Sequence, residues 1–494
     1  MYNPDIKEFI RLSKKGNVVP VFKEILADME TPVSTFLKLA RNERYSYLLE
    51  SVEGGERWGR FSFISWAPKL VFQSRGKKVS VRAPKENPSW RPAEKPLDEL
   101  KQLMSEFKPV EVKGLPRFWG GAVGYASYDM VRFIEKLENK PADRLGLPDS
   151  VFLITDHLVI FDHLKHTLKI VVCADMRNGD DPKTVYKCAV EEIEKIESKL
   201  EKSAVPGRRK AKSRRPDEVT SNMTGRDFEK IVVKAKKYIK AGDIIQTVLS
   251  QRFSKKLNAE PFDVYRALRL LNPSPYMYFI NLDGFSIAGS SPEILVRKED
   301  STAETRPIAG TKPRGKTEQE ETRLVRELLS DKKERAEHIM LVDLGRNDLG
   351  RVCRHGSVKV PQLMTIEKYS HVIHIVSSVT GTLKPGVDSY DLFAACFPAG
   401  TLSGAPKIRA MEIIDELEPE ARGPYGGAVG YFSFSGNMDM AITIRTMIVK
   451  DGTAYIQAGA GIVYDSVPSR EYQESKNKAA ALFAAIDMAE KGIE

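Results

Sequence analysis

The hexapeptide Gly120-Gly-Ala-Val-Gly-Tyr125 occurs a second time, letter for letter, as Gly426-Gly-Ala-Val-Gly-Tyr431. A strand-like segment follows each copy, and glycine within a strand marks a place where backbones approach closely. We therefore expect a duplicated sheet unit whose two halves pack sheet against sheet. Chance recurrence of strand chemistry is the alternative explanation of a six-letter match.

The second half of the chain has further strand patterns around the second copy. Apolar and β-branched residues run or alternate over 276–282, 285–297, 440–450 and 453–458. Helical patterns cover 317–343 and the alanine-rich segment 469–491. Because strands and helices do not alternate strictly, an α+β fold is favoured over a doubly wound parallel sheet.

A basic segment divides the chain. Proline and glycine punctuate residues 206–216, which predicts a linker between an N-terminal region, 1–205, and a C-terminal region, 217–494. Helices are expected on both sides, over 184–202 and over 224–242 with Thr224 as the N-cap. At 494 residues the chain is long enough for two domains or for one large layered unit.

The composition is that of an ordinary globular protein, with 41% hydrophobic and 29% charged residues. The sequence has no apolar run of membrane-spanning length and no apolar signal-peptide core, so we expect a cytoplasmic protein with no membrane partner. The net charge of +10 raises the alternative of a nucleic-acid partner, but six of the positive charges lie in residues 207–216. A solvated linker is the preferred interpretation. The four scattered cysteines are typical of reduced core residues.

Pairs of glutamates occur at the same spacing in two predicted helices. Glu334 and Glu337 are three residues apart, as are Glu471 and Glu474, so each pair shares one helix face. Lys478 extends the second stripe. Four carboxylates from two helices provide the oxygen ligands that Mg²⁺ prefers. Two solvated acidic faces are the alternative, and spacing alone favours that simpler interpretation.

Other groups suit an anionic substrate. The segment Gly459-Ala460-Gly461 offers backbone amides as an anion nest. Arg445 falls within an apolar predicted strand, where an unpaired guanidinium is costly, so a carboxylate partner from protein or ligand is expected. His371 and His374 lie in a neighbouring strand-like run, and either also fits a core histidine.

The segment Gly310-Thr-Lys-Pro-Arg-Gly-Lys-Thr317 matches the P-loop pattern and raises the alternative of a nucleotide-hydrolysing enzyme. The following helix begins with Glu318, Glu320 and Glu321, which repel phosphate at the helix N-terminus where it would bind. Pro313 also removes a backbone donor from the loop. Both features argue against nucleotide binding.

Taken together, these motifs resemble the chorismate-utilising enzymes, and in particular the anthranilate synthase large-subunit family, from about residue 31 to the C-terminus. The resemblance implies a four-layer sandwich of two large, mainly antiparallel sheets between helices, internally duplicated. The matching segments run in order along the chain: Gly242–Gln246, Ser291–Glu293, Arg306–Thr311, Ala336–Asp343, Arg346–Asp348, Pro398–Lys407, Tyr425, Ile444–Arg445, Gly459–Val463 and Glu471–Glu474.

The resemblance implies a role for each of these groups in a reaction that aminates chorismate and then eliminates pyruvate. Glu337 and Glu474 would be the main Mg²⁺ ligands, with Glu334 and Glu471 acting through waters. Glu293 would protonate the departing ring hydroxyl, which requires a raised pKa. The remaining implied roles are carboxylate binding by Tyr425, Arg445, Lys478 and the amides of Gly459, Ala460 and Gly461, contact with the ring by Thr311, and assistance to pyruvate elimination by His374.

Two positions separate this chain from relatives with other products. Isochorismate and salicylate synthases carry a lysine where Gln246 stands, and glutamine cannot activate water, which implies ammonia as the nucleophile. Aminodeoxychorismate synthases often carry a nucleophilic lysine in place of Ala309. Some of them lack that lysine, so an aminodeoxychorismate synthase of the 4-aminobenzoate pathway stays the alternative function.

The N-terminal region carries a pattern similar to the tryptophan feedback-inhibition signature of the family. The segment Leu48-Leu-Glu-Ser51 resembles one wall of that inhibitor site, and the segment 272–277 resembles the other. A strand packed against a proline-rich turn is the alternative. The implied inhibitor residues are Leu49, Glu50, Ser51, Ser62, Asn272, Pro273, Pro275, Tyr276 and Met277.

A source of ammonia is not evident within the chain. A glutamine amidotransferase requires a cysteine on a tight, glycine-flanked turn with a histidine partner, and none of the four cysteines has such flanks. We therefore expect a separate glutaminase subunit, and hence a hetero-oligomer. No nucleic-acid partner is expected.

Overall fold

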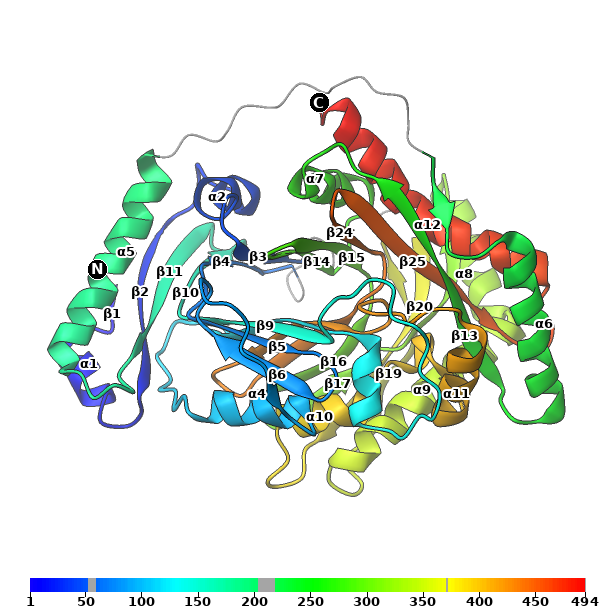
Figure 1. The fold of residues 1–494 in the computed structure, drawn as a ribbon, viewed down its shortest axis with the longest axis horizontal. Coiled ribbons are helices and arrows are strands. Elements are labelled where there is room, and N and C mark those ends of the chain that lie inside the picture. The colour runs from blue at the N-terminus through cyan, green and yellow to red at the C-terminus, as the bar shows by residue number, and fades with distance from the viewer. Residues whose placement is uncertain (52–58, 203–217, 370–371, 494) are drawn as a thin grey trace.

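The structure is a computed structural model that describes all residues except 52–58, 203–217, 370–371 and 494. Two large sheets lie face to face, with helices over the outer face of each, as Figure 1 shows. All pairings between named strands are antiparallel. The four-layer α+β sandwich implied by the resemblance is therefore confirmed. The predicted linker, 206–216, lies outside the described residues.

The first sheet, sheet A, contains strands from both ends of the chain. Its central pair is β3 (Tyr45–Glu50) and β14 (Tyr276–Leu282). On the β3 side follow β4 (Phe61–Trp66), β10 (His157–Asp162), β11 (Thr167–Asp175), β2 (Val18–Leu26) and β1 (Tyr2–Asn3). On the β14 side follow β15 (Phe285–Ser291), β24 (Thr446–Lys450), β25 (Thr453–Ile462), β13 (Gln246–Lys256) and β12 (Thr220–Ser221), and β21 (Gly404–Ala405) also pairs with β13.

The second sheet, sheet B, is centred on β8 (Gly121–Ala126) and β22 (Ala428–Ser433). On the β8 side follow β9 (Ser150–Thr155), β5 (Leu70–Ser74), β6 (Lys78–Arg82) and β7 (Arg91–Pro92). On the β22 side follow β23 (Met438–Ile442), β16 (Ile294–Glu299), β17 (Thr302–Thr305), β20 (Val372–Thr382) and β18 (Ile308–Pro313), and β19 (Lys359–Lys368) also pairs with β20.

The repeated hexapeptide forms the middle of sheet B. Its two copies pair directly, with Gly124 opposite Gly430. A Cβ at Gly124 would lie 1.8 Å from the carbonyl oxygen of Val151, and one at Gly430 would lie 2.1 Å from that of Asp439, so the glycines permit close strand approach. The expectation that the halves pack sheet against sheet is wrong: the repeat joins them edge to edge, and each half supplies strands to both sheets.

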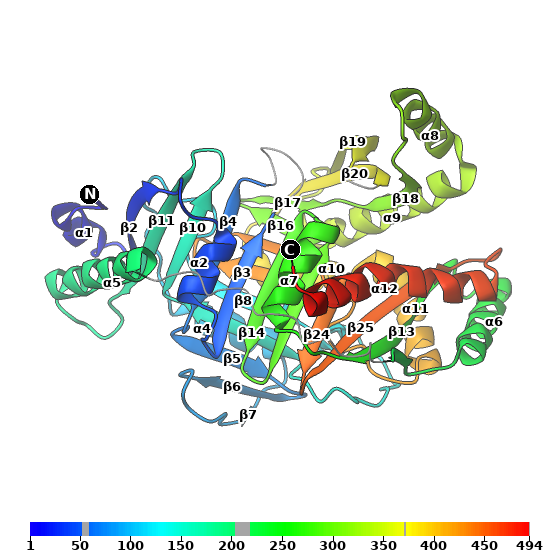
Figure 2. The ribbon, with the colours of Figure 1, turned by 90° about the horizontal axis from the view of Figure 1, so that it is seen from above.

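The outer face of sheet A carries one group of helices, which share a hydrophobic core with it. They are α1 (Ile6–Leu12), α2 (Pro32–Leu39), α5 (Pro182–Lys202), α7 (Pro261–Leu271) and α12 (Pro468–Lys491). Further along the same sheet, α6 (Gly225–Ala241) and α11 (Lys407–Leu417) pack near β13. Figure 2 shows α2, α7 and α12 side by side across this face.

The outer face of sheet B is covered by α4 (Pro96–Ser105), α9 (Lys332–Val352) and α10 (Ser389–Cys396). A further helix, α8 (Glu318–Ser330), precedes α9, and two short 3₁₀ segments are η1 (Tyr128–Phe133) and η2 (Gly400–Leu402). The expected helix over 317–343 is thus two helices, separated at Asp331, whose carboxylate caps α9 by accepting from the amides of Lys333 and Glu334.

Two predicted strands are each divided between the sheets. Residues 285–297 form β15 in sheet A and β16 in sheet B, and residues 440–450 form β23 in sheet B and β24 in sheet A. Their apolar residues are covered on both faces, so the sequence pattern stays apolar through the crossing. These two crossings position the candidate active site.

The helices at 184–202 and 224–242 are confirmed, with Thr224 as N-cap of α6 and Gly242 in the left-handed conformation at its C-terminus. All four cysteines are free, but the core prediction is wrong for Cys188, which is exposed on α5. Among the described residues, no helix is both long and apolar enough to cross a membrane.

Candidate active site

Glu293 and Arg445 lie at the two places where the chain crosses between the sheets. Glu293 follows β15 and precedes β16, and Arg445 follows β23 and precedes β24. The amide of Ile442 donates to the carbonyl of Glu293 (3.0 Å), and the amide of Ser290 donates to the carbonyl of Arg445 (3.1 Å). These bonds join the two crossings into one unit. Arg445 has a φ of +50°, which costs about 1–2 kcal/mol for a residue with a side chain.

The Arg445 side chain is partly buried and donates from Nη1 to the main-chain carbonyl of Lys478 (3.0 Å). Among the described residues it has no ion-pair partner within 4.0 Å. Burial lowers the pKa of Arg445, and the nearby Tyr425 and Glu474 oppose that shift. A desolvated guanidinium without a carboxylate partner is suited to bind an anionic ligand.

Lys478 connects α12 to β25. Its Nζ donates to the carbonyl of Gly459 (3.0 Å) and lies 2.7 Å from Oε1 of Glu474, one helical turn earlier. The residue whose carbonyl Arg445 contacts therefore carries a second positive charge, which is paired with Glu474. Residues 459–461 are extended strand at the end of β25, where they pair with β13 and not with β24, and anion binding by their amides stays a prediction.

Glu293 is a buried acid beside these cations. Burial raises its pKa to about 8, while a hydrogen bond from Thr401 Oγ1 to Glu293 Oε1 (3.0 Å) and the Lys478 charge oppose the shift. The side chain is therefore protonated at neutral pH. A carboxylic acid that holds its proton in a partly dry site is suited to general acid catalysis.

Gln246, the first residue of β13, faces the same region. Its Nε2 donates to Oε1 of Glu337 (3.4 Å), and a Cβ at Gly461 would lie 2.5 Å from that nitrogen. Its Oε1 is buried and has no hydrogen-bond partner among the described residues. Such an orphaned acceptor is suited to a donor supplied by a ligand.

The two glutamate pairs lie on α9 and α12, as predicted from their spacing. Burial, together with the charge of its partner in each pair, raises the pKa of Glu334 and of Glu471. A cation would relieve this repulsion. Among the described residues, however, no three acidic, histidine or cysteine side chains are close enough together to hold a metal ion. Binding of one Mg²⁺ by all four glutamates would therefore require their side chains to move closer together.

Thr311 and His374 lie opposite each other on β18 and β20. His374 Nδ1 is 3.1 Å from the carbonyl oxygen of Gly310 and 3.1 Å from Oγ1 of Thr311. Because a carbonyl only accepts, Nδ1 carries the proton and Nε2 of the neutral ring is the acceptor. Burial lowers the pKa of His374, which favours the neutral form. His371 lies outside the described residues.

The P-loop alternative is contradicted by the structure. Gly310 lies within β18 rather than in a phosphate-binding loop. The amide of Lys316, which would face a phosphate, donates to the Glu320 carboxylate (2.9 Å), and Arg314 donates to Glu321 (2.5 Å). Carboxylates of α8 therefore occupy the helix N-terminus themselves.

A separate cavity lies between the sheets, near their central strands. Its volume is about 310 Å³, and it is lined by six of the nine predicted inhibitor residues: Leu49, Glu50, Ser51, Pro275, Tyr276 and Met277. The other three do not line it. Ser62 is buried, and its hydroxyl bonds to His163. Asn272 bonds to Ser290, and Pro273 follows it in the turn that leads to Pro275 on the cavity wall.

The opposite wall of this cavity was not predicted from the sequence. It includes Arg297, Glu299 and the second hexapeptide copy through Val429, Gly430 and Tyr431, all on sheet B, while Arg60, Phe61 and Phe63 extend the sheet A wall and Arg117 also lines the cavity. The repeat was the available signal, since three residues of its second copy line the cavity.

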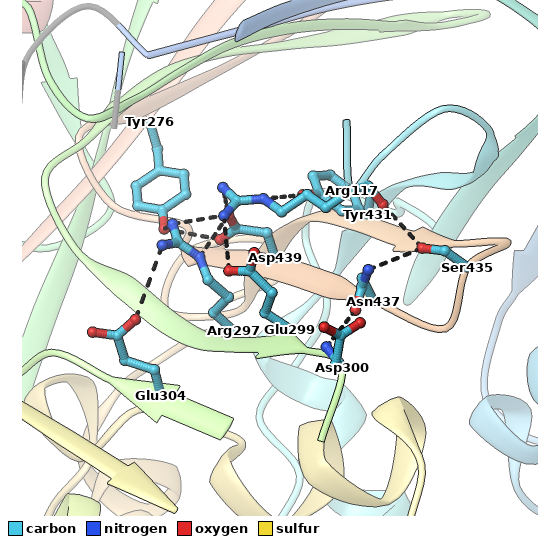
Figure 3. Close-up of polar contacts among 10 residues, drawn as sticks. All are labelled: Arg117, Tyr276, Arg297, Glu299, Asp300, Glu304, Tyr431, Ser435, Asn437 and Asp439. Carbon is cyan, nitrogen blue, oxygen red and sulfur yellow. Dashed lines mark hydrogen bonds and ion pairs between the residues drawn. The ribbon is translucent and has the colours of Figure 1, made fainter. Parts of the chain in front are cut away.

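A polar network forms one end of the cavity (Figure 3). Asp439 accepts from Arg117 Nη2 (3.0 Å), Arg297 Nε (3.0 Å) and the Tyr276 hydroxyl (2.9 Å), and Arg117 Nε donates to the Tyr431 hydroxyl (3.2 Å). Arg117 Nη1 also lies 3.6 Å from Glu299 Oε2, and Arg297 Nη1 lies 4.0 Å from Glu304 Oε2, so two guanidiniums and three carboxylates meet at this end. At the other end the Glu50 carboxylate is held by Tyr265 (2.6 Å) on α7.

Comparison with known proteins shows the family of this chain. The family model for chorismate binding enzyme matches residues 45–484. Anthranilate synthase component 1 of Acetivibrio thermocellus is 50% identical over 497 aligned residues, covering 99% of each chain. The protein of that name from Aquifex aeolicus is 49% identical, covering 100% of this chain and 99% of its own.

A solved structure is also similar. Anthranilate synthase component I from Streptococcus pneumoniae superposes with a TM-score of 0.77 at 37% identity, covering 93% of this chain and 98% of its own. The chain therefore belongs to the chorismate binding enzymes and, within them, to the anthranilate synthase component 1 family.

Proposed function

We propose that this chain converts chorismate and ammonia to anthranilate, pyruvate and water, the first step of tryptophan biosynthesis. The observation that carries the proposal is the juxtaposition of a protonated buried acid, Glu293, with two cations, Arg445 and Lys478, of which Arg445 has no ion-pair partner among the described residues. Chorismate carries two carboxylates and a ring hydroxyl that must leave as water, so its chemistry matches this set.

In the first step, ammonia adds to the ring while the ring hydroxyl departs. Glu293 donates the proton that lets the hydroxyl leave as water. The orphaned Oε1 of Gln246 accepts a hydrogen bond from the incoming ammonia and holds it against the ring. Glutamine cannot deprotonate water, so hydroxylation of the ring is disfavoured.

In the second step, a ring proton is removed and the enolpyruvyl group leaves as pyruvate, which restores the aromatic ring. Neutral His374 presents Nε2 as an acceptor for this elimination, with Gly310 fixing its tautomer. Thr311 contacts the same imidazole and lies beside the reacting ring. Arg445, assisted by Tyr425, holds the enolpyruvyl carboxylate so that the leaving group is aligned.

We further propose Mg²⁺ as the cofactor. Glu337 and Glu474 would hold it directly, with Glu334 and Glu471 acting through waters, as carboxylate oxygens and retained waters suit this ion. The ion would supply positive charge to the ring carboxylate. The raised pKa values of Glu334 and Glu471 support the proposal, because each pair is strained electrostatically without a cation.

Tryptophan is the proposed inhibitor in the cavity between the sheets. The cavity volume of about 310 Å³ is at the lower end of the range for small-molecule sites, and apolar walls beside an arginine-rich end suit an aromatic amino acid. A glutaminase subunit is the proposed partner and source of ammonia, as the component 1 names of the relatives imply a second component.

The test is incubation of the purified chain with chorismate, Mg²⁺ and ammonium at alkaline pH, followed by chromatography and fluorescence. Anthranilate with equimolar pyruvate is the expected result. An amino-chorismate that yields 4-aminobenzoate only after a lyase is added would assign the alternative pathway. Isochorismate or salicylate would contradict the role given to Gln246.

A further inference from the structure

Ser290 stands between the inhibitor cavity and the substrate-binding arginine. It is the penultimate residue of β15 and is fully buried. In the sheet register it lies opposite Met277, which lines the cavity. Its side chain and its backbone contact segments that lead to the two candidate sites, although Ser290 itself lines neither site.

The side chain of Ser290 holds the turn that leads into the cavity wall. Its hydroxyl bonds to the carbonyl of Asn272, lies 3.0 Å from the side-chain amide of Asn272 and lies 2.8 Å from the hydroxyl of Ser274. Pro273 and Pro275 fix φ at two positions of this turn, which restricts its backbone conformation. A ligand against Pro275 or Met277 therefore acts on the turn that Ser290 holds.

The backbone of Ser290 supports Arg445. Its amide donates to the Arg445 carbonyl (3.1 Å), at the residue whose φ is +50°. A left-handed conformation at a non-glycine residue persists only where its surroundings over-determine it. The Ser290 amide is one of those constraints, and the Arg445 side chain in turn reaches Lys478.

We propose that Ser290 is a positioning residue that couples occupancy of the cavity to the hold of Arg445 on chorismate, an inference that rests on the proposed inhibition by tryptophan. When tryptophan orders the 272–277 segment, the contacts of the Ser290 hydroxyl transmit this change to Ser290. The hydrogen bond from the Ser290 amide to the Arg445 carbonyl then changes, and with it the backbone conformation of Arg445. The coupling is reciprocal, so chorismate weakens tryptophan binding by the same factor.

The decisive variant is Ser290→Ala, which keeps the backbone amide and deletes the contacts to Asn272 and Ser274. The measurements are the chorismate dissociation constant at zero and saturating tryptophan, and the tryptophan dissociation constant by calorimetry with and without chorismate. In the unaltered chain we expect tryptophan to weaken chorismate binding about 5- to 150-fold, the usual range of such coupling. In Ser290→Ala we expect this factor to fall to below about 2, with both separate affinities within about 3-fold.

The matched control is Ser46→Ala on the same sheet, where the buried hydroxyl has no partner among the described residues. It removes the same atom and should keep the full coupling. Ser274→Ala removes only one of the contacts and should reduce the factor partially, which provides a second reading should Ser290→Ala fail to fold.

Separate outcomes identify separate failures. If the unaltered chain does not bind tryptophan, the proposed inhibition is wrong and the inference falls with it. If the unaltered chain and both the Ser290 and Ser274 variants bind tryptophan and retain the same coupling factor, the proposed inhibition stands and the assignment of Ser290 is overturned.

Discussion

The guanidinium of Arg445, on the crossing between the sheets, donates to the main-chain carbonyl of Lys478 on α12. Lys478 in turn donates to the carbonyl of Gly459 on β25. The crossing, β25 and α12 are thereby joined by two hydrogen bonds that both involve Lys478. The relationship explains how an arginine in an apolar segment is tolerated, because its surroundings are built to receive an anion.

Replacement of Arg445 by lysine should weaken chorismate binding. Lysine keeps the charge but loses the planar fork that binds a carboxylate through two bonds. A hydrogen bond to a charged group contributes about 1.5–3 kcal/mol, so we expect a KM for chorismate about 10- to 100-fold higher. Steady-state kinetics measure this. Arg323→Lys on the exposed face of α8 is the control, and an unchanged KM in Arg445→Lys would remove Arg445 from the site.

Glu293→Gln should abolish activity and stabilise the fold at alkaline pH. The folded chain keeps the Glu293 proton up to about pH 8, whereas an unfolded glutamate releases it near 4.5. Folding therefore takes up a proton between these values, and the stability due to Glu293 falls as pH rises through that window. Glutamine removes this dependence while it still accepts from Thr401.

Thermal or denaturant unfolding at pH 5 and pH 8 tests the stability prediction. The advantage of Glu293→Gln should be small at pH 5 and should grow by about 1.4 kcal/mol per pH unit up to pH 8. An equal advantage at both values would mean that Glu293 is ionised in the folded chain. Asp343→Asn on an exposed position of α9 should show no comparable trend.

The fold was predictable from the sequence in its class but not in its connections. The strand pattern at 276–282 was correct, because Pro275 precedes it and Asp283 and Gly284 follow it. The pattern at 453–458 ended too early, since β25 continues through Gly459 and Gly461 to Ile462. The pattern over 285–297 did not reveal the crossing. Both β15 and the first part of β16 are covered on both faces, so the sequence shows no change where the chain passes from one sheet to the other. Pro292 was the only local sign that the strand is interrupted.

The candidate site was partly predictable for the same physical reason. Glutamate spacing on a helix is local, so Glu334 with Glu337 and Glu471 with Glu474 were found directly. Arg117 in the cavity between the sheets was missed, because its contact with Asp439 joins residues 322 positions apart. Periodicity carries no information about such a contact, which exists only once both sheets are assembled.

Leu49→Trp should relieve tryptophan inhibition without loss of catalysis. Leu49 is partly exposed and lines the cavity of about 310 Å³, so an indole at this position fills space that the effector would use. We expect the inhibitory concentration to rise at least about 10-fold, as one well-packed aromatic group contributes more than 1.4 kcal/mol. Leu164→Trp, on an exposed turn, is the control. Unchanged inhibition would place tryptophan elsewhere.

Glu474→Gln should remove the response of the chain to Mg²⁺. In the unaltered chain, Mg²⁺ binds the folded state and should raise the unfolding temperature as its concentration increases. Because the pKa values of Glu334 and Glu471 are raised, protons compete with the ion, and the Mg²⁺ affinity should fall as pH decreases through the acidic range.

Calorimetric titration at two pH values, with chorismate turnover measured alongside, checks both effects. Glu192→Gln on the exposed face of α5 changes the charge equally and should leave the Mg²⁺ response intact. A Mg²⁺ response that survives in Glu474→Gln but disappears in Glu337→Gln would assign the ion to α9 alone, whereas survival in both variants would contradict the proposed magnesium site.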